Sequence, residues 1–115
     1  MTSRKIGHVL HDILEAIDRI DQVTRGRTLA EFEANWEMSW LVQRGIEIIS
    51  EASRAIPDHV KNVRSEIPWR KVARIGNVLR HGYDAVSDRI IWGVVTDELP
   101  KLKMAIEAIA ATLNE

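Results

Sequence analysis

Apolar residues recur every three or four positions along almost the whole chain, and this spacing constrains the fold more than any other feature of the sequence. It places apolar side chains on one face of each of several successive α-helices. Apolar and polar residues do not alternate with a two-residue period over more than a few positions, so no β-sheet is expected. The sequence therefore predicts an all-α protein.

The first half of the chain predicts three helices. A long amphipathic helix is expected from Ser3 to about Val23, and Arg25-Gly26-Arg27 ends it. Thr28 and Glu31 have the spacing of a capping box, in which each side chain bonds the other residue's backbone N–H, and they open a short second helix. A longer helix is expected from about Asn35 to Ala55. Its candidates for burial are Trp36, Trp40, Ile46, Ile49 and Ala52.

The second half predicts the remaining helices. Residues 57 to 66 are expected to form a short helical turn, and Pro68 stands at the start of a central helix, where its missing N–H costs nothing. Gly82 is expected to end that helix, because glycine readily adopts the left-handed conformation common after a helix. Ser87 is a good cap for the next helix, and Thr96-Asp97 are expected to cap the last one. The predicted inner face of the last helix consists of Leu102, Ile106, Ile109 and Leu113.

Length and composition fit a single domain covering residues 1–115. Short connections favour antiparallel neighbours, so the expected fold is an up-and-down bundle of four main helices plus one or two short ones. The chain has no cysteine, which excludes disulfides and thiolate metal sites. The longest apolar run is about six residues, far too short to span a membrane, and no leader is expected before the first helix. A soluble, cytoplasmic protein is expected.

Positive charge is concentrated in one part of the sequence. The formal net charge of −1 argues against a protein that coats nucleic acid by bulk electrostatics. Residues 61 to 80, however, hold six basic side chains and one acid, a balance of +5, whereas residues 1 to 60 hold seven bases and ten acids, a balance of −3. The basic segment is therefore the part of the chain best suited to attract a phosphate backbone.

The same segment contains a candidate site. On a helix, Arg74, Asn77 and His81 lie at i, i+3 and i+7 and share one stripe, and Tyr83 follows just past the helix end. An imidazole titrates near neutral pH and can transfer protons, and a guanidinium binds phosphate oxygens in a forked geometry. Taken alone, such a stripe is more often a solvated helix face than a site, and both interpretations stay open on the residues themselves.

Other constellations have simpler explanations. Glu47 and Glu51 lie one helical turn apart, but Arg44 and Arg54 each stand three residues from one of them, so surface ion pairing accounts for the set. His8 and His11 lie at i, i+3, a spacing compatible with zinc, but the sequence offers no obvious third ligand. No metal site is expected. The four tryptophans either pack in the core and interfaces or form a stacking platform for bases, and the first use is commoner in a small bundle.

Beyond these patterns, the segment IPWRKVARIGNVLRHGY (residues 67–83) resembles the signature region of HepT-like proteins of the HEPN superfamily, in which an arginine lies four to six residues before His-x-Tyr. The resemblance extends along the chain. It includes residues 10–20, Glu31-Phe32, residues 43–58, and residues 90–103 with their Leu-Pro. Agreement over several separated segments is much more specific than an arginine and a histidine at matching spacing.

The resemblance implies a HEPN-type helical bundle that forms a homodimer, with the two motif helices facing each other in a cleft. It implies a metal-independent endoribonuclease, without a cofactor, that cuts RNA in this cleft as the toxin of a type II toxin–antitoxin module. The expected partner is a cognate minimal nucleotidyltransferase antitoxin, which in some systems transfers AMP to the motif tyrosine. No association with a membrane is expected.

Carried over by position, the expected catalytic residues are Arg74, Asn77 and His81, and the expected site of modification is Tyr83. The side chains expected to bind the RNA backbone are Arg80, Arg70 and Lys71. The common form of the family places arginine directly before the asparagine, where this chain has Gly76, and Arg74 fits the looser spacing. This departure keeps a second hypothesis open, a weakened or non-catalytic HEPN dimer that binds a nucleotidyltransferase partner or nucleotides.

Overall fold

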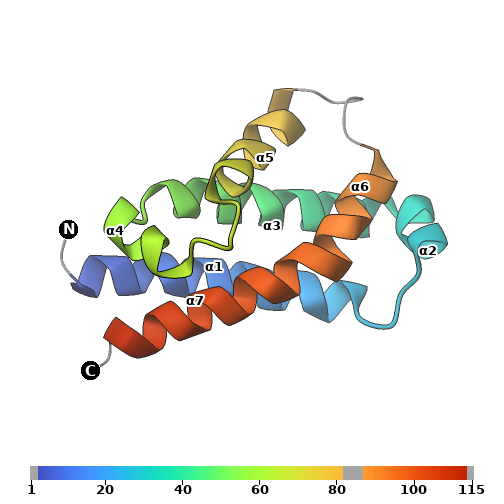
Figure 1. Ribbon diagram of the computed structural model, residues 1–115. Coiled ribbons are helices and arrows are strands. Elements are labelled where there is room, and N and C mark those ends of the chain that lie inside the picture. The colour runs from blue at the N-terminus through green and yellow to red at the C-terminus, as the bar shows by residue number, and fades with distance from the viewer. Residues whose placement is uncertain (1–2, 82–86, 114–115) are drawn as a thin grey trace.

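The computed structural model describes residues 3–81 and 87–113, and the regular structure in these ranges is entirely helical. The elements are α1 (Ser3–Thr24), α2 (Leu29–Ala34), α3 (Trp36–Arg54), α4 (Asp58–Lys61), a 3₁₀ turn (Asn62–Arg64), α5 (Trp69–His81), α6 (Asp88–Gly93), a π-helical segment (Val94–Glu98) and α7 (Leu99–Leu113). The predicted all-α fold is confirmed (Figure 1). None of the described helices is both long enough and apolar enough to cross a membrane.

The long helices form an up-and-down bundle (Figure 1). α1 packs against α3 and α7, and α5 packs against the opposite side of α3. α3 and α7 run in one general direction, while α1 and α5 run in the other. The first and last described residues lie at the same end of the bundle. α5 leans away from α3, so its C-terminal end projects beyond the body of the bundle.

Local hydrogen bonds set the helix boundaries where the sequence predicts them. Gly26 adopts a φ of +74° after α1, a conformation that costs glycine little. The Thr28 hydroxyl accepts a hydrogen bond from the Glu31 N–H at 3.1 Å, and the Thr28 N–H donates to the Glu31 carboxylate at 3.0 Å, so the predicted capping box is confirmed. Asn35 caps α3 through Met38 N–H, and Ser87 caps α6.

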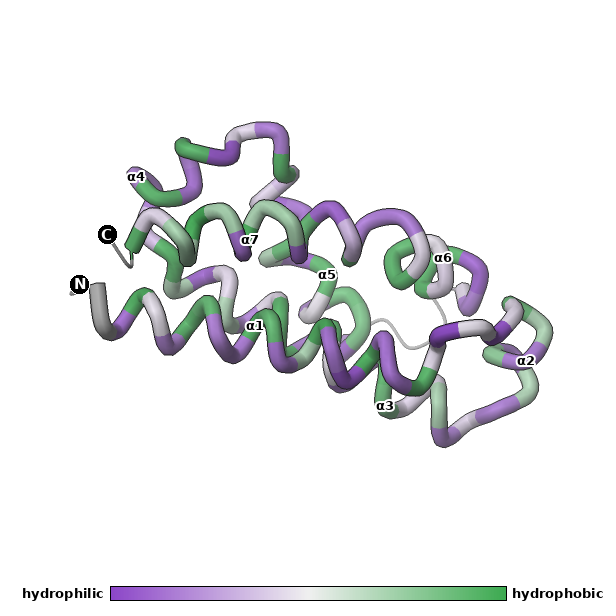
Figure 2. The backbone as a smooth tube through the Cα atoms, turned by 90° about the horizontal axis from the view of Figure 1, so that it is seen from below, coloured by the Kyte–Doolittle hydropathy of each residue, from purple (hydrophilic) through white to green (hydrophobic). Residues whose placement is uncertain are grey.

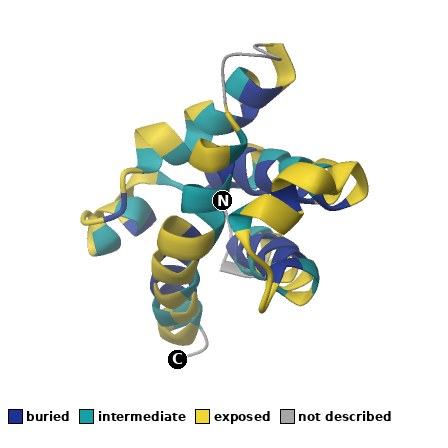
Figure 3. Ribbon diagram, turned by 90° about the vertical axis from the view of Figure 1, so that its right-hand side faces the viewer, coloured by how far each residue is buried: buried dark blue, intermediate teal, exposed yellow. Residues whose placement is uncertain are grey.

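The core lies between α1, α3 and α7. Apolar residues recur among polar ones along α1 (Figure 2), and buried residues occupy the sides of the helices that face one another (Figure 3). Phe32 of α2 is completely buried and stacks on Trp92 with ring centroids 5.2 Å apart. The predicted inner face of α7 is confirmed, with Leu102, Ile106 and Ile109 buried and Leu113 half-buried.

Two of the residues predicted to be buried in α3 are on the surface. Ile46 and Ile49 are buried and Ala52 is half-buried, but Trp36 is 64% exposed and Trp40 is 70% exposed. Both tryptophans lie on the stripe of α3 that also contains Glu47, at i, i+4 and i+11. α5 covers this stripe only near the C-terminal end of α3, so the tryptophans lie beyond the region that it covers.

The predicted cap at Thr96-Asp97 is wrong, because the chain stays helical from α6 through α7. Leu99 N–H bonds the carbonyl of Val94, five residues back, as in a π-helix. Pro100 lacks an N–H, and in an α-helix its ring would collide with the carbonyl four residues earlier. The wider π turn accommodates the proline without ending the helix.

Candidate active site

α5 presents a basic, exposed stripe to solvent. The helix carries four lysines and arginines and no carboxylate. Arg74, Asn77 and His81 are all exposed and share one face, as their spacing predicts. Arg70 lies one turn before Arg74 on the same face and is also exposed. The opposite face carries Gly76 and Leu79, which are buried, so the stripe points away from the bundle core.

The side chains expected to bind RNA do not all share this stripe. Arg70 does, but Arg80 lies one turn after Gly76 and therefore on the side of α5 nearer to α3. Lys71 lines a hollow on the other flank of the helix. The three cations thus surround α5, and only Arg70 continues the line through Arg74 and His81. Tyr83 and Gly82 lie outside the described residues.

A set of hydrogen bonds on one carbonyl fixes α5 just before Arg74. The Ala73 carbonyl accepts from Ser50 Oγ at 2.7 Å and from Arg54 Nη2 and Nε at 2.9 and 3.3 Å. Ser50 Oγ also accepts from Gly76 N–H at 3.1 Å. Hydrogen bonds with a charged donor are among the stronger ones in proteins. We call Ser50, Arg54 and the Ala73 carbonyl the α3–α5 clamp, and it holds the backbone that carries the stripe.

The start of α5 has its own anchor. The indole N–H of Trp69 donates to the carbonyls of Lys61 and Arg64, each at 3.1 Å, and so ties the helix to the preceding turn. Arg64 forms an ion pair with Glu66 at 2.9 Å. Among the described residues, Arg74, Asn77 and His81 make no hydrogen bond or ion pair with another side chain, so their polar groups face solvent.

Gly76 packs directly against α3. A Cβ built on Gly76 would lie 2.6 Å from Ser50 Oγ and 2.7 Å from Ser50 Cβ, both far inside ordinary contact distance. Position 76 therefore faces α3 directly, and any side chain there must displace Ser50. Arg74, by contrast, lies on the exposed face of α5 that also carries His81.

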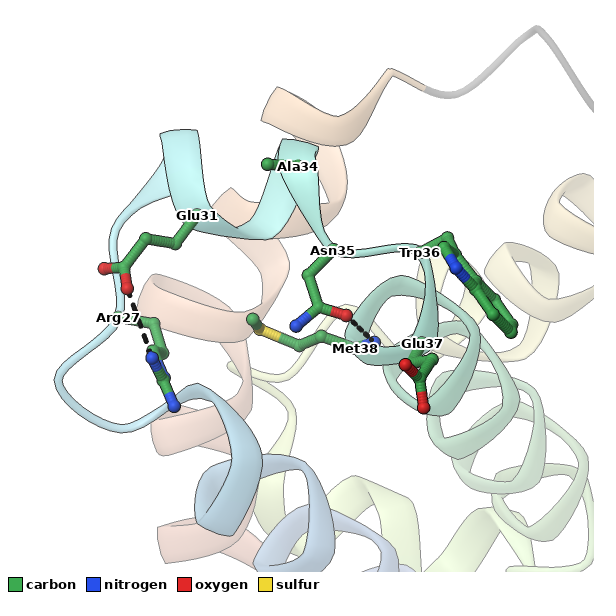
Figure 4. A pocket seen from close by; sticks show the side chains of 7 residues that line it. All are labelled: Arg27, Glu31, Ala34, Asn35, Trp36, Glu37 and Met38. Carbon is green, nitrogen blue, oxygen red and sulfur yellow. Dashed lines mark hydrogen bonds and ion pairs between the residues drawn. The ribbon is translucent and has the colours of Figure 1, made fainter.

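Arg74, Asn77 and His81 line neither of two hollows formed by the described residues. One, of about 430 Å³, lies where α2 meets α3, beside the Arg27–Glu31 ion pair (Figure 4). The other, of about 670 Å³, lies between α5 and the α6–α7 run. The candidate site is therefore an open helix face in the single chain.

The other side chains that the sequence offered as possible metal or acid–base sites form ion pairs with near neighbours. His11 pairs with Glu15 at 3.3 Å, and Arg44 pairs with Glu47 at 3.5 Å. Arg54, expected to pair with a neighbouring glutamate, instead reaches across to α5. Within residues 3–81 and 87–113, no group of three or more histidine, aspartate and glutamate side chains is arranged to hold a metal.

Sequence reasoning missed the clamp. Ser50 and Ala73 lie 23 residues apart, and no local spacing marks that pair. The position of Arg70 on the stripe could, by contrast, be predicted, because Arg70 precedes Arg74 by four residues, about one helical turn.

Comparison with known proteins identifies related sequences. The profile of the family described as "Ribonuclease HepT-like" matches residues 13–109. The chain is 39% identical over 100 residues to "Probable ribonuclease HepT" of Thermococcus cleftensis, covering 87% of this chain and 91% of that protein. It is 30% identical over 109 residues to "Putative RNase MJ1380" of Methanocaldococcus jannaschii, covering 95% of this chain and 100% of that protein. No solved structure is a significant match.

Proposed function

Since this chain belongs to the ribonuclease HepT-like family, we propose that it is a metal-independent endoribonuclease that cuts RNA in a cleft between two protomers. The observation that carries the proposal is the exposed stripe of Arg74, Asn77 and His81 on a helix without carboxylates. The names of the relatives, which describe ribonucleases, support it.

The chemistry follows from the residue types. His81 accepts the proton of a ribose 2′-OH, whose oxygen attacks the adjacent phosphorus. The bond from phosphorus to the 5′-oxygen of the next nucleotide breaks, leaving a 2′,3′-cyclic phosphate and a 5′-OH. Arg74 binds the phosphate oxygens and stabilises the charge that develops on them, and Asn77 hydrogen-bonds the same group. DNA lacks the 2′-OH and is not cut by this route.

A second protomer completes the site. The leaving 5′-oxygen needs a proton, and the stripe of one chain offers one histidine for the two transfers. The His81 of a second copy supplies that proton when the two α5 helices face each other. Arg70, Lys71 and Arg80 attract the RNA backbone from around the helix.

The test compares substitutions in the stripe with matched controls. Purified protein should cut single-stranded RNA in the presence of EDTA. His81→Ala should lower the cleavage rate by about 10²-fold or more, the range for loss of a general acid–base group. Arg74→Lys should also cut more slowly, because lysine keeps the charge but loses the forked geometry. The control variants are His59→Ala and Arg89→Ala, which alter exposed residues outside the stripe. Undiminished cleavage by His81→Ala would refute the mechanism.

We further propose that the protein is the toxin of a type II toxin–antitoxin module whose partner is a minimal nucleotidyltransferase. Transfer of AMP to Tyr83, two residues after His81 in the sequence, would add bulk and negative charge, much as phosphorylation would. Incubation with the partner and ATP should raise the mass by one or more AMP units, and Tyr83→Phe should abolish the increase. A mass shift that persists in Tyr83→Phe would place the acceptor elsewhere.

The second candidate function is a non-catalytic dimer that binds the nucleotidyltransferase or nucleotides. The observation that favours it is Gly76, which replaces the family's usual arginine and is packed against Ser50. RNA that is bound but left intact by the wild-type protein, together with normal growth of cells expressing the protein alone, would favour this function over the nuclease.

A further inference from the structure

Four arginines lie on or beside α5 without a carboxylate to neutralise them. Arg70, Arg74 and Arg80 are exposed on α5, a helix that contains no aspartate or glutamate. Arg54 reaches the same helix from the C-terminal end of α3. Among the described residues, none of these four arginines forms an ion pair. Like charges in one region repel each other, and a bound anion relieves that repulsion.

We propose that Arg54, besides holding α5 against α3, binds an RNA phosphate next to the one bound by Arg74. The proposal rests on the proposed function and deepens it, because it adds a residue of α3 to the RNA-binding surface of α5. It gives Arg54 a contact that a purely structural link between two helices does not need.

The guanidinium of Arg54 has hydrogen-bond donors to spare. Its Nη2 and Nε atoms donate to the Ala73 carbonyl at 2.9 and 3.3 Å. A guanidinium has five N–H groups, so these two bonds leave three without a partner among the described residues. Nε and Nη2 form one edge of the planar group, and the edge formed by Nη1 and Nη2 is free. Because Arg54 is exposed, this free edge is accessible and has the forked geometry that binds two phosphate oxygens.

The Ala73 carbonyl places this guanidinium beside the stripe. Successive residues of a helix are about 100° apart, so Asn77 and Arg70 lie about 40° and 60° from Ala73 around the helix axis. Gly76, which is packed on α3, lies about 60° from Ala73 in the other direction. Along the axis, Arg70 and Asn77 are within about 6 Å of Ala73. Arg54 therefore lies at the border between the packed face of α5 and the stripe, where it can contact an RNA backbone that follows the stripe.

Arg54 is held in place before a ligand binds. A long side chain that must become ordered on binding loses conformational entropy, and this loss weakens its contribution to affinity. The two hydrogen bonds to Ala73 already fix the guanidinium of Arg54. Glu51, three residues before Arg54 on α3, is not among its ion-pair partners in the described part of the chain. Arg54 thus offers a fixed positive charge to an anionic ligand.

Two substitutions of Arg54 separate its charge from its hydrogen bonds. In Arg54→Gln, the amide nitrogen follows Cδ as Nε does in arginine, so the variant keeps a donor for the Ala73 carbonyl and loses the charge. Arg54→Lys keeps the charge and loses the planar edge. The matched control is Arg44→Gln, which removes the same charge from the same helix. Arg44 pairs with Glu47 and lies about 15 Å from Arg54 along α3.

The experiment measures binding of the full-length protein to a fluorescent 2′-O-methyl oligouridine, which lacks the attacking 2′-OH, over a range of KCl concentrations. Loss of one phosphate contact on a single strand lowers the magnitude of the slope of log Kd against log[KCl] by about 0.7. Arg54→Gln should show this decrease and bind about tenfold more weakly at low salt. The loss should be the same for 2′-O-methyl oligoadenosine, because phosphate contacts carry no sequence information. Arg54→Lys and Arg44→Gln should retain the wild-type slope.

Cleavage of unmodified RNA gives an independent measurement. Arg54→Gln should raise KM by about tenfold and leave kcat within about twofold of wild type, because it removes a contact made equally in the ground state and the transition state. A displaced α5 would instead lower kcat, in Arg54→Lys as well as in Arg54→Gln. Urea unfolding with circular dichroism shows whether each variant is folded.

The outcomes separate this proposal from the nuclease proposal. An unchanged slope in Arg54→Gln, beside a reduced slope in Arg74→Gln, would overturn the proposal and leave the nuclease intact. An equal reduction in Arg44→Gln would also overturn it, in favour of a general effect of charge. A reduced slope in Arg54→Gln, in a protein whose His81→Ala variant cuts RNA normally, would support the phosphate contact and refute only the mechanism. A wild-type protein that binds neither oligonucleotide would overturn both proposals.

Discussion

Substituting Gly76 by alanine tests whether the close contact between α3 and α5 positions the stripe. The added Cβ would stand 2.6 Å from Ser50 Oγ and 2.7 Å from Ser50 Cβ, so the side chain of Ser50 must move or the helices must separate. Ser50 cannot move freely, because its hydroxyl bonds both Ala73 and Gly76. Rotating it away breaks both hydrogen bonds.

The expected magnitude combines three contributions. Overpacking a tight contact costs about 1–3 kcal/mol. Loss of a hydrogen bond to a buried N–H adds about 1 kcal/mol. Replacing glycine by alanine inside a helix returns up to about 1 kcal/mol. We therefore expect Gly76→Ala to lower the free energy of unfolding by about 2 kcal/mol, measured by urea unfolding with circular dichroism.

Two further variants make this prediction sharp. Gly7 lies inside α1, and a Cβ built on it meets no atom within 4 Å, so Gly7→Ala should stabilise the protein by up to about 1 kcal/mol. The double variant Ser50→Gly/Gly76→Ala removes the Ser50 Oγ and Cβ atoms that the new Cβ would meet. The stability changes of the two substitutions should therefore not add, and a double-mutant cycle should give a coupling energy above about 1 kcal/mol. If Gly76→Ala is stabilised as much as Gly7→Ala, the packing argument is wrong.

The remaining predictions concern stability. Phe32→Ala should lower the free energy of unfolding by about 3–5 kcal/mol, because the ring is fully buried against Trp92; a loss below about 1 kcal/mol in urea would contradict this. Ser50→Ala should lower the free energy of unfolding by about 1–3 kcal/mol, because it removes the hydrogen bonds of Ser50 Oγ with the Ala73 carbonyl and the Gly76 N–H; unchanged stability in urea would contradict this. The hydrogen bonds of Glu31 with Arg27, then Thr28, hold its pKa below the usual value of 4.5. Its charge therefore stabilises the fold above that pH and the contribution is lost as the pH falls through the lower, folded pKa. The melting temperature of wild type should exceed that of Glu31→Gln at pH 7, and the difference should shrink as the pH is lowered below 4.5.

Features set by neighbouring residues could be predicted from the sequence. The capping box at Thr28 and the caps at Asn35 and Ser87 depend on side chains within three residues of the N–H that they bind. Helical periodicity likewise places Arg74 and His81 on one face whatever the rest of the chain does. Both kinds of inference are local, and the structure agrees with them.

Features set by distant contacts could not be predicted. Whether Trp36 and Trp40 are buried depends on how far α5 extends along α3, and the residue type alone favoured burial. The clamp joins Ser50 and Arg54 to a backbone carbonyl, so the partner has no side-chain signature. The π-helical segment forms because the chain stays helical from α6 to α7 although Pro100 lies in it. The spacing of the residues around Pro100 does not reveal that the helix continues.

Arg54 links the stability of the site to the distribution of charge. Its guanidinium does not pair with a glutamate of α3. Instead it donates hydrogen bonds to the Ala73 carbonyl on α5, one residue before Arg74. This contact adds a cation to the region around the stripe while leaving the exposed part of α3 with more carboxylates than unengaged arginines. A single long-range contact thus holds α5 in place beside α3 and adds a positive charge next to Arg74.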